Sequence, residues 1–371
     1  MSRRLTVVQL LPDLDAGGVE RSTLEIADAL VRAGHRAIVV SAGGRLVPQL
    51  QTLGAEHVTL AIGRKSPWVL RHVQPLRRLF ADQQVDIVHA RSRLPAWLAR
   101  FALGGMPAAT TPHFVTTVHG LNSPSRYSRV LATGERVICV SDTVRAHVLH
   151  HYPDIDPARL HVIPRGIDPA DFPRASADDA IAARERIAAE WPQLGGPGPL
   201  LLLPGRGTRL KGHADALHLL VELRRSGSDA RLWMVGARQA GRDAYLAELE
   251  GLARDLTIDD AIALTPPTHG IVEAYAASDL VLQLSRKPEA FGRTVLEALA
   301  VGRPVLGWAH GGVGELLREW QPAGAVQPFD ADALLQGAQA MLAAPPLPPV
   351  TMPDGLRAMQ QATLALYEQL A

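Results

Sequence analysis

The sequence predicts an α/β protein with two doubly wound parallel sheets, one in each half of the chain. Three observations support this. Short apolar runs rich in β-branched residues alternate with longer amphipathic stretches along the whole chain. The loop Q-L-G-G-P-G-P at 193–199 separates two such series. The length of 371 residues, 47% of them hydrophobic, exceeds the usual size of one domain.

The first series contains six apolar runs that we expect to form strands. They are residues 5–11, 37–41, 85–89, 114–119, 136–140 and 160–164. Helices are expected between them, including 18–33, which Gly34 closes. A second helix is expected at 66–81, because Ser66 can cap it and Pro67 suits its first turn.

The second series contains five further expected strands. They are residues 200–204, 231–236, 261–265, 279–284 and 304–308. A last helical stretch follows the Pro-rich segment 343–350 and covers 354–370. We therefore expect four parts: a Rossmann-like domain at 1–170, a linker at 171–198, a second Rossmann-like domain at 199–350 and a C-terminal helix within 351–371. Two such sheets with facing strand ends are expected to form a ligand cleft.

Composition excludes several classes of protein. No uninterrupted apolar run approaches the ~20 residues of a membrane-spanning helix, and the first residues lack the pattern of a signal peptide, so we expect a cytoplasmic protein. The single cysteine, Cys139, cannot form an internal disulfide or a cysteine-based metal cluster. Its surroundings, V-I-C-V-S, indicate a buried strand residue.

Charge is distributed unevenly although the net charge is only +1. Residues 1–170 contain 20 Lys and Arg against 13 Asp and Glu, and the remainder contains 18 against 24. Within 64–100 eight basic residues accompany only Asp82 and Asp86. The eight are Arg64, Lys65, Arg71, Arg77, Arg78, Arg91, Arg93 and Arg100. This stretch fits either a solvated helix surface or a surface for an anionic partner such as a membrane face or a phosphorylated glycolipid. No nucleic-acid motif accompanies it, so we expect no nucleic-acid partner.

The loop D-A-G-G-V-E-R at 15–21 follows the first expected strand and opens the first helix. Gly17 and Gly18 allow close approach of a ligand, and the helix N-terminus favours an anion. The loop is not G-x-G-x-x-G, which leaves a dinucleotide site poorly supported. A tight turn without a ligand remains an alternative.

The second series opens with a similar strand and loop, L-L-L-P-G-R-G-T-R-L-K-G-H at 201–213. Arg206 and Lys211 stand five residues apart across a Gly-containing loop, so both can neutralise one diphosphate. The spacing does not match a P-loop. Exposure for solubility is the alternative explanation of these two residues.

The stretch E-A-F-G-R-T-V-L-E at 289–297 marks the start of another expected helix. Glu289 precedes the helix and can accept hydrogen bonds from sugar hydroxyls, and Glu297 lies about one turn inside and can bind a ribose diol. Either glutamate alone is also explained by the helix dipole. Four backbone N–H groups at the helix start are expected to be open to a ligand: those of Phe291, Gly292, Arg293 and Thr294.

His119 ends the strand of T-V-H-G, at the edge of the first sheet where ligands are expected. A single histidine is often structural. Gly120 beside it permits close approach of a substrate, which favours a functional position.

Taken together, these residues resemble the family 4 retaining glycosyltransferases of GT-B fold. The resemblance spans nearly the whole chain, through G-G-V-E-R, T-V-H-G, V-I-P-R-G-I-D, P-G-R-G-T-R-L-K-G-H and the E-x7-E arrangement from Glu289 to Glu297. It implies a nucleotide-sugar donor held mainly by the C-terminal domain and an acceptor held mainly by the N-terminal domain. It further implies front-side attack without a protein nucleophile, no metal or other cofactor, and a last helix that packs on the N-terminal domain.

The resemblance also implies a role for each candidate residue. Arg206 and Lys211 would bind the diphosphate and assist its departure, Glu297 would hold the ribose and Glu289 the donor sugar. Gly17 and Gly18 would meet the diphosphate or the sugar. His119 would contact the transferred sugar near the reacting carbon. Together they form the expected catalytic set of His119, Arg206, Lys211 and Glu289.

Two departures concern loops near the expected cleft. Arg165 stands in P-R-G-I-D where the family often has Asn, and T-P-P-T-H-G at 265–270 replaces a more usual T-G-x loop. The variants H-A-R-S-R-L-P-A-W and K-P-E-A-F-G-R-T-V-L-E-A-L look most like enzymes of lipopolysaccharide core assembly in proteobacteria. We therefore expect a lipid-linked, anionic saccharide acceptor and peripheral contact with the inner face of the plasma membrane. A small soluble acceptor, a non-catalytic nucleotide-sugar-binding scaffold and a dehydrogenase are the alternatives.

Overall fold

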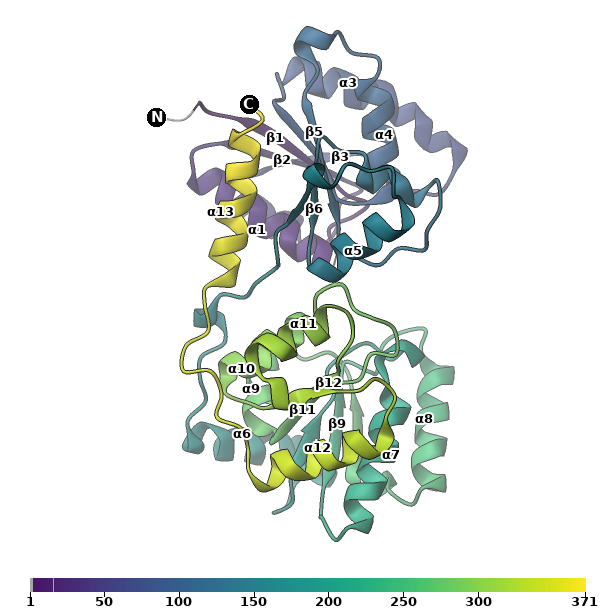
Figure 1. Cartoon of the computed structure of the whole chain (residues 1–371), viewed down its shortest axis with the longest axis vertical. Helices are drawn as coiled ribbons and strands as arrows, with labels where there is room; N and C mark the ends of the chain where they lie inside the picture. Colours follow the sequence, from purple (N-terminus) through teal and green to yellow (C-terminus); the bar gives the residue numbers. More distant parts are fainter. Residues whose placement is uncertain (1–2, 16) are drawn as a thin grey trace. The chain divides into compact units, whose positions relative to one another are not determined.

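The computed structural model describes residues 3–15 and 17–371 and divides the chain into two compact units (Figure 1). The first unit comprises Met1–Arg165 and Gly355–Ala371, and the second comprises Gly166–Asp354. Ala16, part of the expected ligand loop 15–21, lies outside the described residues.

The first unit contains a seven-stranded parallel sheet with the strand order β3-β2-β1-β4-β5-β6-β7. Its strands are β1 (Thr6–Leu10), β2 (Arg36–Ser41), β3 (Glu56–Thr59), β4 (Ile87–Ala90), β5 (His113–Val118), β6 (Arg136–Cys139) and β7 (Leu160–Val162). All four residues of β4 are buried, as expected for a central parallel strand covered on both faces. The strand β3 was not predicted, because E-H-V-T is short, only partly buried and without an apolar run.

Helices cover this sheet. They are α1 (Gly18–Arg32), α2 (Val47–Thr52), η1 (Pro67–His72), α3 (Val73–Asp82), α4 (Arg93–Leu103), η2 (Ala108–Thr110), η3 (Ser128–Ala132), α5 (Asp142–His151), η4 (Pro157–Arg159) and α13 (Gly355–Glu368). The helix expected at 66–81 is a 3₁₀ turn followed by α3. Ser66 caps it as expected, because its hydroxyl accepts from the Trp68 N–H.

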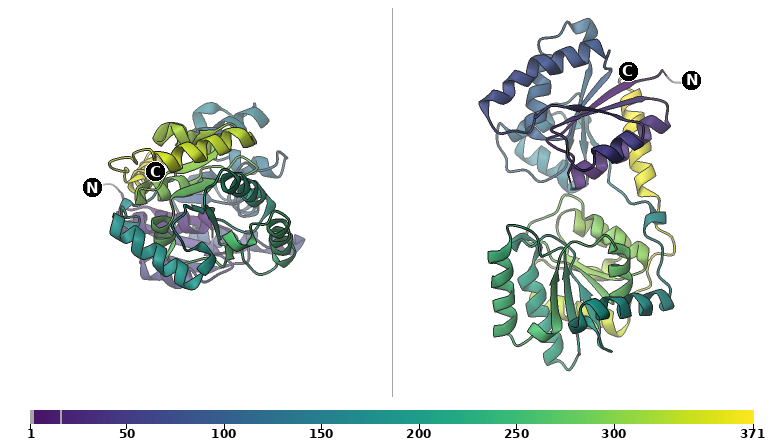
Figure 2. Two further views of the ribbon diagram at one scale, coloured as in Figure 1. Left: turned by 90° about the horizontal axis from the view of Figure 1, so that it is seen from below. Right: turned by 180° about the vertical axis from the view of Figure 1, so that it is seen from behind.

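The last helix, α13, packs against α1 within the first unit, as Figures 1 and 2 show. The Gln360 side chain donates to the Glu25 carbonyl over 2.8 Å. Leu366 and Tyr367 are buried in the same apolar cluster as Leu24 and Ile26 of α1. Residues far apart in sequence thus complete one core.

The second unit contains a six-stranded parallel sheet with the strand order β10-β9-β8-β11-β12-β13. Its strands are β8 (Leu200–Leu202), β9 (Arg231–Val235), β10 (Ile262–Thr265), β11 (Leu280–Gln283), β12 (Val305–Trp308) and β13 (Ala325–Val326). Its helices are η5 (Pro169–Asp171), α6 (Ala177–Glu190), η6 (Pro192–Leu194), η7 (Arg209–Lys211), α7 (His213–Arg225), α8 (Asp243–Asp255), η8 (Asp259–Ala261), α9 (Ile271–Ala277), α10 (Arg293–Val301), α11 (Gly311–Trp320), η9 (Pro322–Gly324) and α12 (Ala331–Ala343).

Residues 171–198, expected to be a linker, are part of the second unit instead. Helix α6 packs against α9 and buries Ala183 and Ile187 in the core of this unit. The Gly and Pro residues of 193–199 mark the turn into β8 and not the edge of a domain. The boundary between the units falls between Arg165 and Gly166, close to the expected residue 170.

Each sheet has one point where the strand order reverses along the chain. It lies between β1 and β4 in the first unit and between β8 and β11 in the second. Ligands of open α/β sheets bind outside the carboxyl ends of the strands at such a switch point. The loops that follow these four strands are therefore the places to look for a site. No described helix has the length and apolarity required to cross a membrane.

Candidate functional site

In the second unit, Lys211 and Glu289 come from the two loops that flank the switch point. Lys211 ends the short turn η7 after β8, and Glu289 lies in the loop after β11. The Lys211 Nζ is 2.5 Å from the Glu289 Oε1, and the two side chains are 25% and 23% exposed. Two residues that the sequence assigned to different parts of a donor are thus brought into contact.

Glu289 has further partners that the sequence analysis missed. The Ser285 hydroxyl donates to the Glu289 carboxylate. The His310 Nε2 donates to the Ser285 carbonyl over 2.8 Å, and the Gly312 N–H donates to the Glu289 carbonyl over 2.8 Å. The H-G-G sequence after β12 has a Gly pair behind a strand, as Gly17–Gly18 does after β1. This shared pattern could have indicated His310 and Gly312 from the sequence.

Helix α10 begins beside this ion pair. Gly292, its N-cap, has a φ of 99°, in the left-handed region that favours glycine. A Cβ at this position would lie 2.7 Å from the Val313 Cγ2, so space also requires glycine. Phe291 is buried, while Arg293 and Thr294 are partly exposed. The first N–H groups of a helix have no acceptor within the helix and attract anions.

Glu297 lies in α10 and is held by Tyr275 of α9. The buried Tyr275 hydroxyl donates to the Glu297 Oε2 over 2.8 Å. Burial, together with the charge of Glu297, raises the pKa of Tyr275 well above its ordinary value, so this phenol keeps its proton. The contact fixes one carboxylate oxygen, and the other can serve a ligand.

Arg206 lies in the same loop as Lys211 but is not part of the ion pair. Its side chain is exposed, and it has no carboxylate partner among residues 3–15 and 17–371. Gly205 beside it leaves room for the aliphatic chain of Lys211, because a Cβ there would lie 3.3 Å from the Lys211 Cδ. Of the two candidate donor-binding cations in this loop, Lys211 is therefore paired and Arg206 faces solvent.

In the first unit, the switch point carries the Gly17–Gly18 turn after β1 and Arg91 after β4. Gly17 has a φ of 146°, and α1 begins at Gly18. Arg91 is 4% exposed and donates to the Gln9 Oε1 over 2.9 Å and to the Ser22 Oγ over 2.5 Å. Burial lowers the pKa of Arg91 to about 10, which still leaves the guanidinium charged at neutral pH.

His119 follows β5 at the same edge of the sheet. Its Nδ1 lies 2.5 Å from the Arg165 guanidinium, and its buried Nε2 has no hydrogen-bond partner among the described residues. Burial, with Arg165, Arg91 and His89 nearby, lowers the pKa of His119 well below its ordinary value. A cavity of about 20 Å³, enough for one water molecule, lies among His119, Arg91 and Thr117.

The basic residues of 64–100 fall into two groups. Arg77 donates to the carbonyls of Phe101 and Ala102 at the end of α4, Arg91 is buried, and Arg93 contacts Ser128. The other five are exposed: Arg64, Lys65, Arg71, Arg78 and Arg100. Trp68 and Leu70 of η1, between them in sequence, are 77% and 54% exposed. We call these five basic residues, Trp68 and Leu70 the basic-apolar patch.

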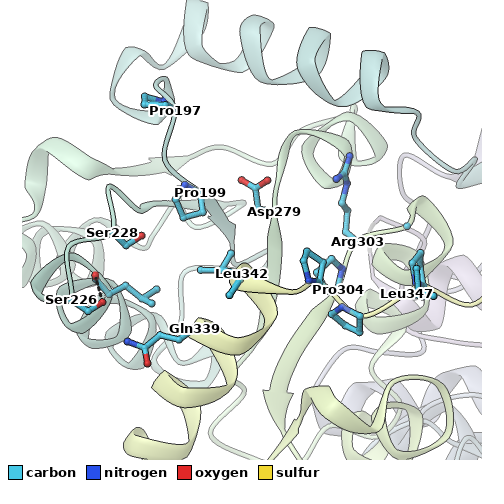
Figure 3. A pocket seen from close by; sticks show the side chains of 16 residues that line it. Pro197, Pro199, Ser226, Ser228, Asp279, Arg303, Pro304, Gln339, Leu342 and Leu347 are labelled. Carbon is cyan, nitrogen blue, oxygen red and sulfur yellow. Dashed lines mark hydrogen bonds between the residues drawn. The ribbon is translucent and has the colours of Figure 1, made fainter.

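A pocket of about 660 Å³ lies elsewhere in the second unit (Figure 3). Pro199, Asp279 and Pro304, which line it, precede β8, β11 and β12. It therefore lies at the amino ends of these strands, whereas Lys211 and Glu289 follow their carboxyl ends.

Cys139 is buried, and burial raises the pKa of its thiol to about 12, as expected for a structural cysteine. Among the residues described, no group of three or more His, Cys, Asp or Glu side chains is arranged to hold a metal ion.

Each half of the chain matches a known protein family model. The family described as Glycosyltransferase Family 4 matches residues 16–171, and Glycosyl transferases group 1 matches residues 190–350. The D-inositol 3-phosphate glycosyltransferase of Xylanimonas cellulosilytica is 30% identical over 247 residues, which cover 62% of this chain. The match spans 56% of that relative's length.

Solved structures match the chain over nearly its whole length. A glycosyltransferase from Rickettsia africae is 26% identical, with a TM-score of 0.84 and coverage of 99% of this chain and 98% of the other. Anabaena HepE, solved in complex with UDP and glucose, is 18% identical with a TM-score of 0.74 and coverage of 99% and 95%. WaaG, a glycosyltransferase involved in lipopolysaccharide biosynthesis, is 19% identical with a TM-score of 0.68 and coverage of 98% and 97%. The chain therefore has a GT-B fold, and each of its two halves matches a glycosyltransferase family model.

Proposed function

We propose that this chain is a retaining glycosyltransferase that uses a nucleotide-diphosphate sugar as its donor. The observation that supports this most directly is the contact of Lys211 with Glu289 beside the N-terminus of α10, with Glu297 held one turn further on. A cation, a carboxylate, the N-terminus of a helix and a second carboxylate match the diphosphate, sugar and ribose of one donor. Both families that match the chain are glycosyltransferase families.

In this proposal the second unit binds the donor. Lys211 and Arg206 neutralise the diphosphate and stabilise the charge that develops as it leaves. Glu289 accepts from hydroxyls of the sugar, and Glu297 binds the ribose. The acceptor oxygen bonds to the anomeric carbon on the face from which the diphosphate departs, and its proton passes to the leaving phosphate oxygen. Neither a protein nucleophile nor a metal is assigned a step.

Calorimetric titration with UDP, GDP, ADP, CMP and NAD tests the donor site. We expect one nucleoside diphosphate to bind in the micromolar range, and Glu297→Ala to abolish that binding. Binding of NAD alone would favour a dehydrogenase, and the absence of any binding would overturn the proposed donor site. Nucleotide-sugar binding without transfer to any acceptor would favour a non-catalytic scaffold.

For the acceptor we propose an anionic, lipid-linked saccharide of the lipopolysaccharide-core kind. The basic-apolar patch supports this, because exposed cations attract anionic headgroups while Trp68 and Leu70 can enter the interface. A small soluble acceptor that carries a phosphate is the second candidate. The name of the Xylanimonas relative, an inositol 3-phosphate glycosyltransferase, favours it.

Vesicle sedimentation separates the two acceptors. Lipid-linked transfer predicts binding to vesicles with anionic lipid and loss of that binding in Arg71→Gln/Arg78→Gln. Arg77 should be left in place, because it caps α4 and its removal would disturb the fold. Arg254→Gln, which alters an exposed arginine of the second unit, is the matched control. If the wild-type protein does not bind vesicles with anionic lipid, the soluble acceptor is favoured.

A further inference from the structure

Arg165 contacts two residues of the candidate site at once. It stands three positions after the end of β7, in the loop where the sequence departs from its family. One guanidinium nitrogen, NH2, lies 2.5 Å from the His119 Nδ1. The other, NH1, donates to the Gly18 carbonyl over 2.7 Å. One side chain thus connects the end of β5 to the first turn of α1.

Gly18 is matched to this contact. A Cβ at Gly18 would lie 2.7 Å from the Arg165 NH1, closer than carbon and nitrogen approach without displacement. A side chain at position 18 would therefore require the Arg165 guanidinium to move. An asparagine at 165 would be shorter and would offer a single amide nitrogen as donor, so it could not join both partners in this way.

The contact determines where the His119 ring carries its proton. An arginine guanidinium stays protonated in proteins and can only donate, so the His119 Nδ1 must accept. A neutral ring that accepts at Nδ1 carries its single proton on Nε2. The ring is neutral at pH 7, because burial and its cationic neighbours oppose the positive charge that a second proton would bring.

We propose that Arg165 is a positioning residue that locks His119 in the Nε2–H tautomer and ties it to the Gly17–Gly18 turn. The ring is then oriented as a donor from Nε2, while the same guanidinium fixes the backbone that opens α1. The tautomer stands on the geometry of the first unit alone. Its consequence for turnover rests on the proposed glycosyltransferase activity.

The charged and titratable groups around His119 come from several elements. Arg165 lies after β7, and His89 and Arg91 lie in and after β4. Glu20 of α1 interacts electrostatically with Arg165 and has Asp13 and Asp15 nearby. The His89 ring is itself engaged on both sides, by Tyr367 and by Thr117. Arg165 is the one that contacts the His119 ring directly in the part of the chain that the structure describes.

Nitrogen and carbon NMR of histidine-labelled protein tests the tautomer without any substrate. The His119 signals are assigned by their loss in His119→Gln. We expect wild-type His119 to show the Nε2–H tautomer from pH 6 to 8, and Arg165→Met to show mixed tautomers and a pKa closer to 6.5. Arg159→Met, an exposed arginine of the same unit, should change nothing. An Nδ1–H tautomer in the wild type, or an unchanged ring in Arg165→Met, would overturn the proposal.

Gly18→Ala tests the same contact from the opposite side and protects the experiment against a folding defect in Arg165→Met. The added methyl should displace the guanidinium and produce the same change at His119. If transfer activity is found, Arg165→Met should lower kcat on the order of tenfold with little change in the donor KM. It should also move the fall of kcat at acid pH to a higher pH than in the wild type, because the ring then gains a second proton more readily. Failure of all transfer would leave the NMR result to decide the tautomer.

Discussion

The Lys211 ammonium and the Glu289 carboxylate, 78 residues apart in sequence, lie 2.5 Å from each other at the switch point of the second sheet. The Ser285 hydroxyl donates to the same carboxylate oxygen. The cation proposed to bind a diphosphate is therefore already partly neutralised in the chain without a donor. An arriving diphosphate must compete with Glu289 for Lys211, so the two side chains should be coupled in binding as well as in turnover.

Glu289→Gln should separate these two effects. An amide no longer attracts Lys211 and no longer repels the diphosphate, so the nucleoside diphosphate should bind as tightly as to the wild type or more tightly. Turnover should fall on the order of 100-fold, because the sugar loses a charged acceptor. Titration with the diphosphate and steady-state rates measure the two quantities. Glu319→Gln, an exposed carboxylate of α11, is the control. An affinity that drops as much as the rate would mean that Glu289 is needed to build the site.

Tyr275→Phe should weaken donor binding several-fold and leave kcat nearly unchanged. The substitution removes the hydrogen bond that orients Glu297 and preserves the packing of the ring. Tyr367→Phe removes a comparable buried hydroxyl in the first unit and should not alter nucleotide affinity. Calorimetric titration of the wild type and the two variants with the nucleoside diphosphate measures these affinities. Equal losses in both variants would point to a general effect on stability.

The fold was predictable where burial leaves long apolar runs. The strands around Val7, Val88 and Val281 are such runs, and their alternation with amphipathic helices indicates a parallel sheet. The strand β3 and the two-residue β13 carry no such pattern, since pairing with a neighbour alone makes them strands. Helix α6 was not predicted, because the loop 193–199, rich in Gly and Pro, was interpreted as a domain boundary and residues 171–198 as a linker. Such a loop can also be a turn within one domain, as it is here.

The positions of Lys211, Glu289 and Gly18 after strand ends were predictable, because apolar runs mark the strands that precede them. Their partners were not. Ser285 and Tyr275 act through contacts that only the packed structure defines, and their local sequences differ little from ordinary loop or helix residues. Arg165 stood out in P-R-G-I-D, but its contact with His119 is visible only in the packed structure. The basic stretch shows the same limit, because the sequence does not distinguish the structural Arg77 from the exposed Arg78.

Stability should fall as the pH drops below about 6.5. The pKa values of His89, His119 and His213 are lowered by burial, that of His213 to about 4. Between the ordinary histidine pKa and the folded value, the unfolded chain binds more protons, so protonation favours unfolding. These contributions are complete above pH 6.5 and are lost as the pH falls toward 4. Thermal unfolding from pH 8 to 5 measures the effect.

His213→Asn should flatten this pH dependence in the second unit. His218→Asn, an exposed histidine of the same helix α7, should leave the curve unchanged. If both variants keep the wild-type curve, another group controls the acid limb.

Shortening Leu366 of α13 should destabilise the first unit selectively. Leu366 is 4% exposed and lies in the cluster formed with α1, so Leu366→Ala should cost about 2–5 kcal/mol of unfolding free energy. The exposed Gln361 of the same helix offers a control, since Gln361→Ala should stay within about 0.5 kcal/mol of the wild type. Hydrogen exchange followed by mass spectrometry locates the loss. We expect weaker protection in α1 and β1 and unchanged protection in α7 and β9, because α13 belongs to the first core although the chain reaches it from the second. Loss of protection centred on α7 and β9 would show that the helix stabilises the second unit instead.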